Sequence, residues 1–218
     1  MTRNTKNVVA IVPAYNEGAR IRLVLEALTV CTDISEVIVV DDGSRESLEW
    51  IREIYPHVRL IRHDSNRGKA AAMETGVAAS HADYVFFCDA DLIGFMSQHA
   101  SAIIQPVLSG SSMMSIGLRQ NPEQRAVFLF ALNSGERCLR RVDWESLPVF
   151  YKKGFRVETG LNFLVKKHGG RIDSQIFPYQ QTLRERKYGM RTGLVSRVRL
   201  CIDVLSAWLY IVFVDLWT

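Results

Sequence analysis

Short apolar runs that alternate with longer amphipathic segments are the feature that most limits how this chain can fold. Four runs have the length and composition of strands buried on both faces, and the segments between them have the spacing of amphipathic helices. The expected strands cover residues 8–12, 37–40, 58–61 and 83–88, and the expected helices cover residues 17–30, 45–55 and 69–79. Strands and helices in this order form right-handed crossovers. The sequence therefore predicts an α/β fold with a mainly parallel sheet covered by helices on both faces.

The length and composition of the chain fit one folded unit of this kind. With 218 residues, 48% of them hydrophobic, the chain can bury one substantial core without a second domain. The net charge of +4 is too small to indicate a nucleic-acid partner. The four cysteines are far apart, which favours free thiols in a reducing compartment. Because the polar start of the sequence leads straight into the first expected strand, no signal peptide is expected.

Polar residues follow each of the four expected strands. The most constraining cluster is Asp89-Ala90-Asp91, which ends the last apolar run. The carboxyl ends of parallel strands gather at one edge of an open α/β sheet, where ligands bind. Two carboxylates that point the same way repel each other, and a divalent cation that prefers oxygen ligands relieves that repulsion. The alternative is that the strand simply ends in an aspartate that caps the next helix.

The polar clusters occur in the order found in one enzyme family. They are Val12-Pro13-Ala14-Tyr15-Asn16-Glu17, Val40-Asp41-Asp42-Gly43-Ser44, Asn66-x-Gly68-Lys69 and Asp89-x-Asp91. Together they resemble the signature of the family 2 glycosyltransferases, inverting enzymes with a GT-A fold that use nucleotide-sugars. The resemblance runs from residue 8 to about residue 175, and the chain is most similar to the polyprenyl-phosphate (dolichol-phosphate-type) sugar transferases. The glycine-rich sequences of dinucleotide-binding and P-loop proteins are absent.

The resemblance implies a donor site built from these clusters. Breaking a sugar–diphosphate bond builds negative charge on the leaving nucleotide, and a bound cation stabilises that charge. The resemblance implies that this cation is Mg²⁺ or Mn²⁺ and that Asp89 and Asp91 hold it. The implied donor-binding residues are Pro13, Tyr15 and Glu17 for the base and ribose, Asp42 for the base, Lys69 for the diphosphate, and Asp89, Ala90 and Asp91 for the diphosphate with its cation.

Candidates for the acceptor side lie in the second half of the sequence. A strand is expected at residues 113–118 and a helix at residues 157–167. Between them, residues 133–141 resemble the acceptor-side Ser-Gly loop and following strand of the family. Arg137 in this segment could hold a phosphate through its forked donors, and the alternative is a surface arginine. Glu158 opens the expected helix, where it could act as a catalytic base or be favoured by the helix dipole alone.

Two elements of related enzymes are absent, and both absences favour transfer of one sugar to a small or phosphate acceptor. Enzymes with sugar acceptors often carry a Glu-Asp pair where this chain has Glu158-Thr159. The Gln-x-x-Arg-Trp element of processive synthases is missing because Glu185 follows Arg184. A phosphate acceptor is already ionised at neutral pH and needs no base. The segment 92–96 also lacks the polar, proline-containing sequence usual after the carboxylate pair of dolichol-phosphate enzymes.

The last part of the sequence differs in character. Between Thr182 and Arg199 six basic residues accompany one acidic residue, and an apolar helix is expected at residues 204–214. A helix of this length is too short to cross a bilayer. A basic segment joined to an aromatic-rich apolar helix is typical of the membrane interface. The alternative is a core helix or the interface of a homodimer.

The sequence therefore predicts a GT-A catalytic domain over residues 1–181, with a nucleotide-sugar half at 8–120 and an acceptor half at 121–181, and a membrane-associating tail at 182–218. The expected reaction is metal-dependent, inverting transfer of a hexose from a UDP- or GDP-sugar to a polyprenyl phosphate. The protein is expected in the cytoplasm, peripheral at the inner face of the membrane. The alternatives are a sugar transferase with a soluble hydroxyl acceptor and a non-catalytic nucleotide-sugar-binding subunit. The intact pair Asp89 and Asp91 argues against the non-catalytic subunit.

Overall fold

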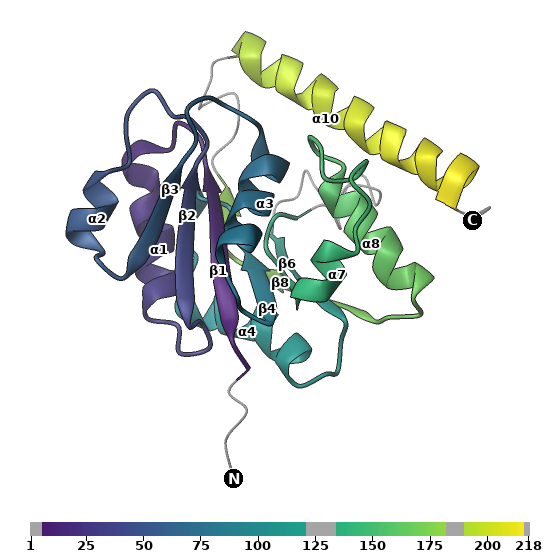
Figure 1. Cartoon of the computed structure of the whole chain (residues 1–218), viewed down its shortest axis with the longest axis horizontal. Helices are drawn as coiled ribbons and strands as arrows, with labels where there is room; N and C mark the ends of the chain where they lie inside the picture. Colours follow the sequence, from purple (N-terminus) through teal and green to yellow (C-terminus); the bar gives the residue numbers. More distant parts are fainter. Residues whose placement is uncertain (1–5, 121–133, 182–189, 216–218) are drawn as a thin grey trace.

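The computed structural model describes residues 6–120, 134–181 and 190–215, and a seven-stranded sheet forms its centre (Figure 1). The order across the sheet is β3-β2-β1-β4-β7-β6-β8. Neighbouring strands are parallel except around β7, which runs antiparallel to β4 and to β6. The strands are β1 Val8–Ala14, β2 Glu36–Asp41, β3 Val58–Arg62, β4 Tyr84–Phe87, β6 Met114–Arg119, β7 Arg137–Arg140 and β8 Ile172–Phe177. The predicted α/β class with a mainly parallel sheet is confirmed.

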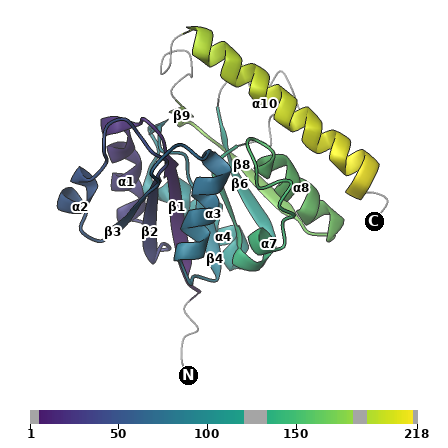
Figure 2. The same cartoon turned by 45° about the horizontal axis from the view of Figure 1, so that its top comes forward.

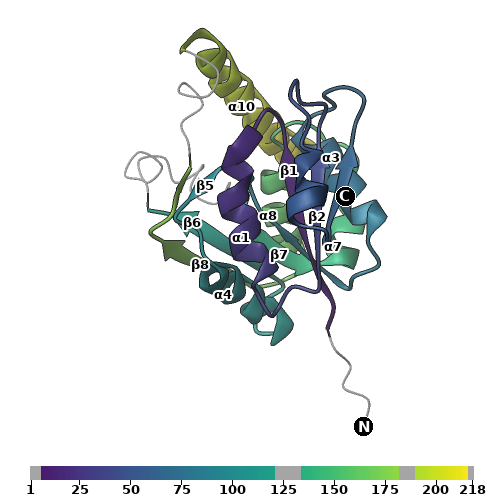
Figure 3. The same cartoon turned by 90° about the vertical axis from the view of Figure 1, so that its left-hand side faces the viewer.

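Helices cover both faces of the sheet because the side chains of each strand alternate between two apolar cores. In β1, Val8 and Val12 pack in the first core and Val9 and Ile11 in the second. Figure 3 shows α1 and α4 on one side of the sheet and α3 and α7 on the other. The first core contains α1 Ile21–Thr29, α2 Trp50–Ile54 and α4 Ser97–Leu108, and the second contains α3 Lys69–Ala79, α7 Arg141–Glu145, α8 Val157–Lys167 and α10 Met190–Tyr210.

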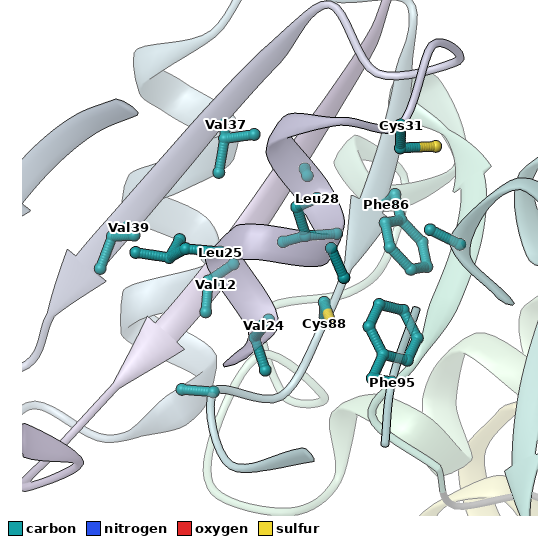
Figure 4. Packing of buried hydrophobic residues seen from close by; sticks show 14 of the residues in the cluster. Val12, Val24, Leu25, Leu28, Cys31, Val37, Val39, Phe86, Cys88 and Phe95 are labelled. Carbon is teal, nitrogen blue, oxygen red and sulfur yellow. The ribbon is translucent and has the colours of Figure 1, made fainter. Parts of the chain in front are cut away.

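The packing of α1 shows why the amphipathic pattern predicted this layer. Val24, Leu25 and Leu28 project from α1 toward β1, β2 and the end of β4, where they meet Val12 and Phe86 (Figure 4). All five side chains are almost completely buried. Each contributes about 1.5–3 kcal/mol of burial free energy, so the layer is fixed by hydrophobic contact.

Two predicted helices are shorter than expected, and the cause lies in their first residues. Asn16 and Gly18 have φ angles of 56° and 53°, in the left-handed region, so the chain forms a 3₁₀ turn over Gly18–Arg20 before α1 begins. After β2, the amide of Ser44 donates to Oδ1 of Asp41 at 2.9 Å, which keeps the following residues in a loop until α2 begins. The expected helices at 17–30 and 45–55 therefore lose their N-terminal turns.

Several elements were not predicted from the sequence. Helix α4 contains Pro106, which hid its helical pattern, and β8 forms the edge strand beside β6. A second sheet consists of β5 Leu92–Ile93 and β9 Gln180–Gln181, paired antiparallel. This small sheet matters for the site, because it brings the segment just before residue 182 next to the segment that follows Asp91.

The C-terminal helix is longer than the predicted segment 204–214. Helix α10 begins at Met190 and continues as a π-helical turn over Ile211–Asp215 (Figure 1). The basic residues Arg197 and Arg199 therefore belong to the same helix as the apolar segment. Among the described residues, no helix is both long enough and apolar enough to span a membrane.

Candidate active site

The carboxyl ends of the parallel strands bring the predicted clusters together. Strand β1 lies between β2 and β4, and all three run in the same direction. The amide of Asn16 donates to Oγ of Ser44 at 2.9 Å, which ties the turn after β1 to the turn after β2. Pro13, Tyr15 and Glu17 lie on or next to this turn. Their predicted contacts with the base and ribose stay predictions.

Asp89 and Asp91 follow β4 and lie within one network of polar side chains. Nζ of Lys69 lies 2.7 Å from Oδ1 of Asp89, and Nη2 of Arg119 lies 2.7 Å from Oδ2. The amide Nε2 of Gln181, from β9, donates to Oδ1 of Asp91 at 2.8 Å and to Oδ2 of Asp89 at 3.2 Å. The two carboxylates therefore share one partner, which places them side by side, although β4 ends at Phe87 and neither aspartate lies on the strand. Figure 2 shows β9 near the same end of the molecule as α10.

Lys69 joins the carboxylate pair to Glu158. Lys69 is the first residue of α3, and its Nζ also lies 3.2 Å from Oε1 of Glu158 in the first turn of α8. Burial alone would lower the pKa of Lys69, but the carboxylates of Asp89 and Glu158 raise it above its usual value. Lys69 therefore carries a positive charge between two carboxylates. The structure brings these predicted site residues together, and the catalytic role of Glu158 stays a prediction.

Arg119 and Glu136 form a buried ion pair behind Asp89. Nη2 of Arg119 lies 2.8 Å from Oε1 of Glu136, and Oγ of Ser134 donates to Oε2 of Glu136 at 2.6 Å. Arg119 also donates to Oε1 of Gln181. Burial raises the pKa of Glu136 above its usual value, and the facing guanidinium of Arg119 offsets part of this rise. Because breaking a buried ion pair leaves an uncompensated charge, Arg119 is held firmly in place.

Arg137, the first residue of β7, is fully buried in the core. Its guanidinium donates to the carbonyl oxygen of Ser134 at 2.7 Å, and Nη1 lies 3.4 Å from both the carbonyl oxygen of Glu158 and Oδ1 of Asn162. Burial lowers the pKa of Arg137. These contacts tie the start of β7 to α8. The contact of Arg137 with an acceptor phosphate stays a prediction, whereas the alternative of a surface arginine does not fit its burial.

Asp42 organises the loop that leads to Lys69. Its carboxylate accepts hydrogen bonds from the amides of Arg67 at 2.9 Å and Gly68 at 2.7 Å, and its Oδ1 lies 2.7 Å from Nδ1 of His63. Gly68, the residue before α3, has a φ of 93°, a conformation that favours glycine. The carboxylate therefore fixes the entry into α3 in addition to any contact with a base.

The carboxylate pair fits a divalent cation whose coordination is completed by phosphate oxygens of a ligand. Among residues 6–120, 134–181 and 190–215, no group of three or more His, Cys, Asp or Glu side chains could hold a metal ion. Asp89 and Asp91 thus offer carboxylate oxygens without a closed protein cage. Mg²⁺ typically binds one or two carboxylates together with substrate phosphates. Residues of this type suit Mg²⁺ or Mn²⁺ delivered with a diphosphate.

Three residues of the network were missed as site residues from the sequence: Arg119, Glu136 and Gln181. Arg119 ends a strand, β6, whose parallel partner is β8, so its place at the carboxyl edge was a usable signal. Glu136 lies in the predicted Ser-Gly loop, but nothing in the sequence indicated which strand it faces. Gln181 reaches the site only through the pairing of β9 with β5, a contact between distant segments that no local pattern indicates.

Comparison with known proteins identifies the sequence signature. Residues 9–106 match glycosyl transferase family 2. The uncharacterized glycosyltransferase YibD of Escherichia coli K12 is 35% identical over 171 residues, which cover 75% of this chain and 44% of that protein. The dolichyl-phosphate beta-glucosyltransferase of Mus musculus is 36% identical over 102 residues, which cover 40% of this chain and 32% of that protein. The chain thus spans less than half the length of these curated relatives.

Solved structures share the fold over nearly the whole chain. Glucosyl-3-phosphoglycerate synthase from Mycobacterium tuberculosis, in complex with Mn²⁺, UDP and phosphoglyceric acid, superposes with a TM-score of 0.75 at 25% identity. The match covers 93% of this chain and 78% of the synthase. The predicted GT-A fold is confirmed by this likeness.

Proposed function

The chain contains a glycosyl transferase family 2 domain, and from this premise we propose that it transfers a hexose from a nucleotide-sugar to an acceptor with inversion at the anomeric carbon. The observation that carries the proposal is the shared contact of Asp89 and Asp91 with Gln181, beside Lys69. The similar synthase holds Mn²⁺ and UDP, which favours a UDP-sugar among the UDP and GDP donors. The cofactor is Mg²⁺ or Mn²⁺.

Each group of the network has a role in this reaction. A divalent cation held by Asp89 and Asp91 supplies Lewis-acid stabilisation of the leaving diphosphate. Lys69 adds a second positive charge close to the same diphosphate, in a site where partial burial strengthens the interaction. Glu158 faces Lys69 as a carboxylate and serves as the base if the acceptor is a hydroxyl. Arg137 holds the start of β7 against α8, the helix that carries Glu158.

We favour a polyprenyl phosphate as the acceptor because α10 presents a continuous exposed apolar face. Val198, Ile202, Leu205, Leu209 and Val212 recur every three or four residues along α10 and its π-helical turn, and all five are exposed. We name this surface the α10 stripe. Its spacing matches one face of a helix, and the opposite face buries Val204 and packs Ala207 and Ile211 in the second core. A lipid acceptor is reached most directly by an enzyme whose exposed apolar helix lies in the membrane interface.

The distribution of charge along the tail also favours an α10 stripe that faces a membrane. The two acidic residues of the helix and its π-helical turn face the domain. Asp203 accepts a hydrogen bond from the amide of Phe155 at 3.0 Å, and Asp215 accepts one from the hydroxyl of Tyr151. The chain segment before the stripe is rich in arginine and lysine. An anionic membrane surface complements both features, so we propose that the tail at 182–218 holds the catalytic domain peripherally at the cytoplasmic face.

A soluble phosphorylated acceptor is the second candidate. The structurally similar synthase, which matches 93% of this chain, was crystallised with phosphoglyceric acid. A small phosphate ester and a polyprenyl phosphate share an anionic group that can be met by the same cations. The missing Glu-Asp pair at Glu158-Thr159 fits either of them better than a sugar hydroxyl.

One experiment tests the donor and separates the acceptors. The purified chain is incubated with Mn²⁺ and radiolabelled UDP-glucose or GDP-mannose, and with undecaprenyl phosphate in detergent, 3-phosphoglycerate or no acceptor. We expect label to move from the aqueous phase to the organic phase with the lipid. Label in a new anionic water-soluble product would favour the soluble acceptor. If neither nucleotide-sugar changes the melting temperature with Mn²⁺ present, the proposed donor binding fails, because binding to the native state raises stability.

A further inference from the structure

Both oxygens of Asp89 already contact a positively charged side chain. Oδ1 lies 2.7 Å from Nζ of Lys69, and Oδ2 lies 2.7 Å from Nη2 of Arg119. A divalent cation that uses Asp89 must therefore join or displace one of these two side chains. Which of them gives way follows from how each is held.

Arg119 is not free to move. Its side chain is 5% exposed, and it contacts Glu136 and Gln181 as well as Asp89. Glu136 is completely buried, so moving Arg119 would leave a buried carboxylate without its compensating charge. Arg119 therefore stays, and it keeps Oδ2 of Asp89 in one orientation.

Lys69 is able to exchange partners. Its side chain is 25% exposed and has a flexible four-carbon stem, so the ammonium group can move without unpacking the core. Glu158 offers a second partner at 3.2 Å, so Lys69 keeps an ion pair when it leaves Asp89. Arg119 therefore holds the carboxylate of Asp89 in place, whereas Lys69 can leave it. The sequence alone does not separate these two roles.

The charges of the network determine what makes Lys69 leave. Within the described part of the chain, the network sets four carboxylates against three cations: Asp89, Asp91, Glu136 and Glu158 against Lys69, Arg119 and Arg137. A divalent ion would turn this net negative cluster into a positive one, which is costly in a partly buried site unless an anion arrives with it. A nucleotide diphosphate is such an anion, and it attracts the ammonium group of Lys69 as well as the metal.

We propose that Lys69 occupies the cation position at Asp89 in the absence of donor and moves to the diphosphate when nucleotide and metal bind together. The inference rests on the proposed nucleotide-sugar function and extends it. Lys69 thereby acts as a placeholder that neutralises the carboxylates before the donor binds. It makes the affinity for metal depend on nucleotide, and by linkage the affinity for nucleotide depends on metal by the same factor.

The test measures binding rather than turnover. Mn²⁺ affinity is measured by electron paramagnetic resonance of the free ion, with and without saturating UDP, for the wild type and for Lys69→Met, Lys69→Arg and Lys152→Met. In the wild type we expect UDP to tighten Mn²⁺ binding by about 5–150-fold, the usual range of coupling between two sites. In Lys69→Met, Mn²⁺ without UDP should bind at least about fivefold more tightly than in the wild type. Because Mn²⁺ already binds this variant more tightly before UDP is added, UDP should tighten Mn²⁺ binding less than in the wild type, and the coupling factor should fall.

The controls separate the placeholder role from a general effect of charge. Lys69→Arg keeps a cation at Asp89 and should retain the weak nucleotide-free binding of the wild type. Lys152 forms a comparable ion pair with Glu74 at 3.1 Å outside the site, so Lys152→Met should leave both affinities unchanged. Urea unfolding of each variant confirms that the fold is kept.

Each remaining outcome has a defined meaning. If the wild type binds Mn²⁺ with UDP but Lys69→Met shows no gain in nucleotide-free Mn²⁺ affinity, the placeholder role is overturned and the proposed function stands. If the wild type binds neither Mn²⁺ nor UDP when both are present, the proposed function and the inference fall together.

Discussion

Asp91 lies two residues after Asp89 in the site. An asparagine in its place keeps the shape of the side chain but removes one negative charge. The side-chain oxygen of the asparagine would still accept the hydrogen bond that Gln181 donates to Oδ1 at 2.8 Å, so the fold should be unaffected. Loss of a metal ligand should reduce transfer by more than the roughly 10–100-fold seen when only an outer partner is lost. We expect the transfer rate of Asp91→Asn to fall accordingly, with an unchanged melting temperature.

A matched variant shows whether this effect is specific to the site. Asp173 on β8 is a partly exposed carboxylate that contacts Gln175 at 3.1 Å, away from the carboxylate pair. Asp173→Asn should transfer at the wild-type rate. If Asp91→Asn also transfers at that rate in buffer with limiting Mn²⁺, the assignment of Asp91 to the metal is wrong.

Asp42 shows how a single carboxylate can serve the fold and the site at once. It accepts hydrogen bonds from two backbone amides and contacts His63, all in the loop that leads to Lys69. Asp42→Ala leaves these partly buried amides and the buried His63 without this partner, at a cost of up to about 1–3 kcal/mol each. We expect the free energy of unfolding in urea to fall by at least about 1 kcal/mol and the affinity for UDP with Mn²⁺, measured by calorimetry, to fall with it.

Asp42→Asn separates the two contributions, because an asparagine side chain can accept from one amide while losing the charge. If Asp42→Asn is as unstable as Asp42→Ala but binds UDP with Mn²⁺ as tightly as the wild type, Asp42 takes no part in donor binding. Unchanged stability in Asp42→Ala would contradict the structural role of the loop contacts.

At the scale of elements, the loop that precedes β7 approaches the carboxylate of Asp89 through a glycine. A Cβ atom on Gly135 would overlap the carboxylate of Asp89, so the loop can approach only because this residue has no side chain. Gly135→Ala should push Asp89 out of line with Asp91 and reduce transfer by about 10–100-fold, as expected when a ligand loses its orientation. Steady-state transfer assays at saturating donor measure this loss.

Gly170→Ala provides the comparison for Gly135→Ala. A Cβ atom there would press on Met113 and Val165, at the start of β8 and away from the site. Overpacking of this kind costs typically about 1–3 kcal/mol of stability. Gly170→Ala should therefore lose stability while keeping the transfer rate. Equal loss of transfer in both variants would show that Gly135 acts through stability alone.

Elements whose pattern is local were predictable from the sequence, and those that depend on distant contacts were not. Strands β1, β2 and β4 were found because apolar runs end abruptly in polar clusters, although β1 and β2 extend past the expected ends at residues 12 and 40. Helix α3 was found because its alanines favour a helix. The same reasoning placed Lys69, Asp89 and Asp91 at one edge of the sheet. Gln181 was out of reach, because its place depends on the pairing of β9 with β5, and pairing across distant segments leaves no periodic trace.

At the scale of the whole molecule, α10 determines how the catalytic domain can meet other components of the cell. Figure 1 shows α10 as a long helix that lies across one end of the molecule, above α8. Tyr210 stacks on Phe150 with 3.9 Å between ring centroids, so the helix is attached to the domain through aromatic contacts. The attachment leaves the α10 stripe facing outward, which gives the domain a defined orientation toward any surface that covers the stripe.

The membrane hypothesis predicts that acidic residues in the α10 stripe release the protein from liposomes. Leu205 and Leu209 are 61% and 58% exposed, and burying each leucine in an apolar environment contributes up to about 1.5–3 kcal/mol. Leu205→Glu/Leu209→Glu should therefore lower the fraction that floats with phosphatidylglycerol liposomes by at least about tenfold. Flotation of the wild type should also weaken in high salt, because the basic segment contributes about 1 kcal/mol for each lysine or arginine near an anionic surface.

Val142→Glu/Val149→Glu is the matched control for the liposome experiment. These valines are 58% and 72% exposed and lie outside the α10 stripe, so the variant changes the charge equally and should still float with the wild type. If the stripe instead covers a second copy of the chain, analytical ultracentrifugation without liposomes should show a wild-type dimer and a monomeric Leu205→Glu/Leu209→Glu variant. A wild-type protein that stays at the bottom of the gradient with anionic liposomes contradicts the membrane hypothesis and makes the soluble phosphorylated acceptor the better proposal. A floating wild type whose stripe variant sinks while the valine variant floats identifies the α10 stripe as the membrane-binding face.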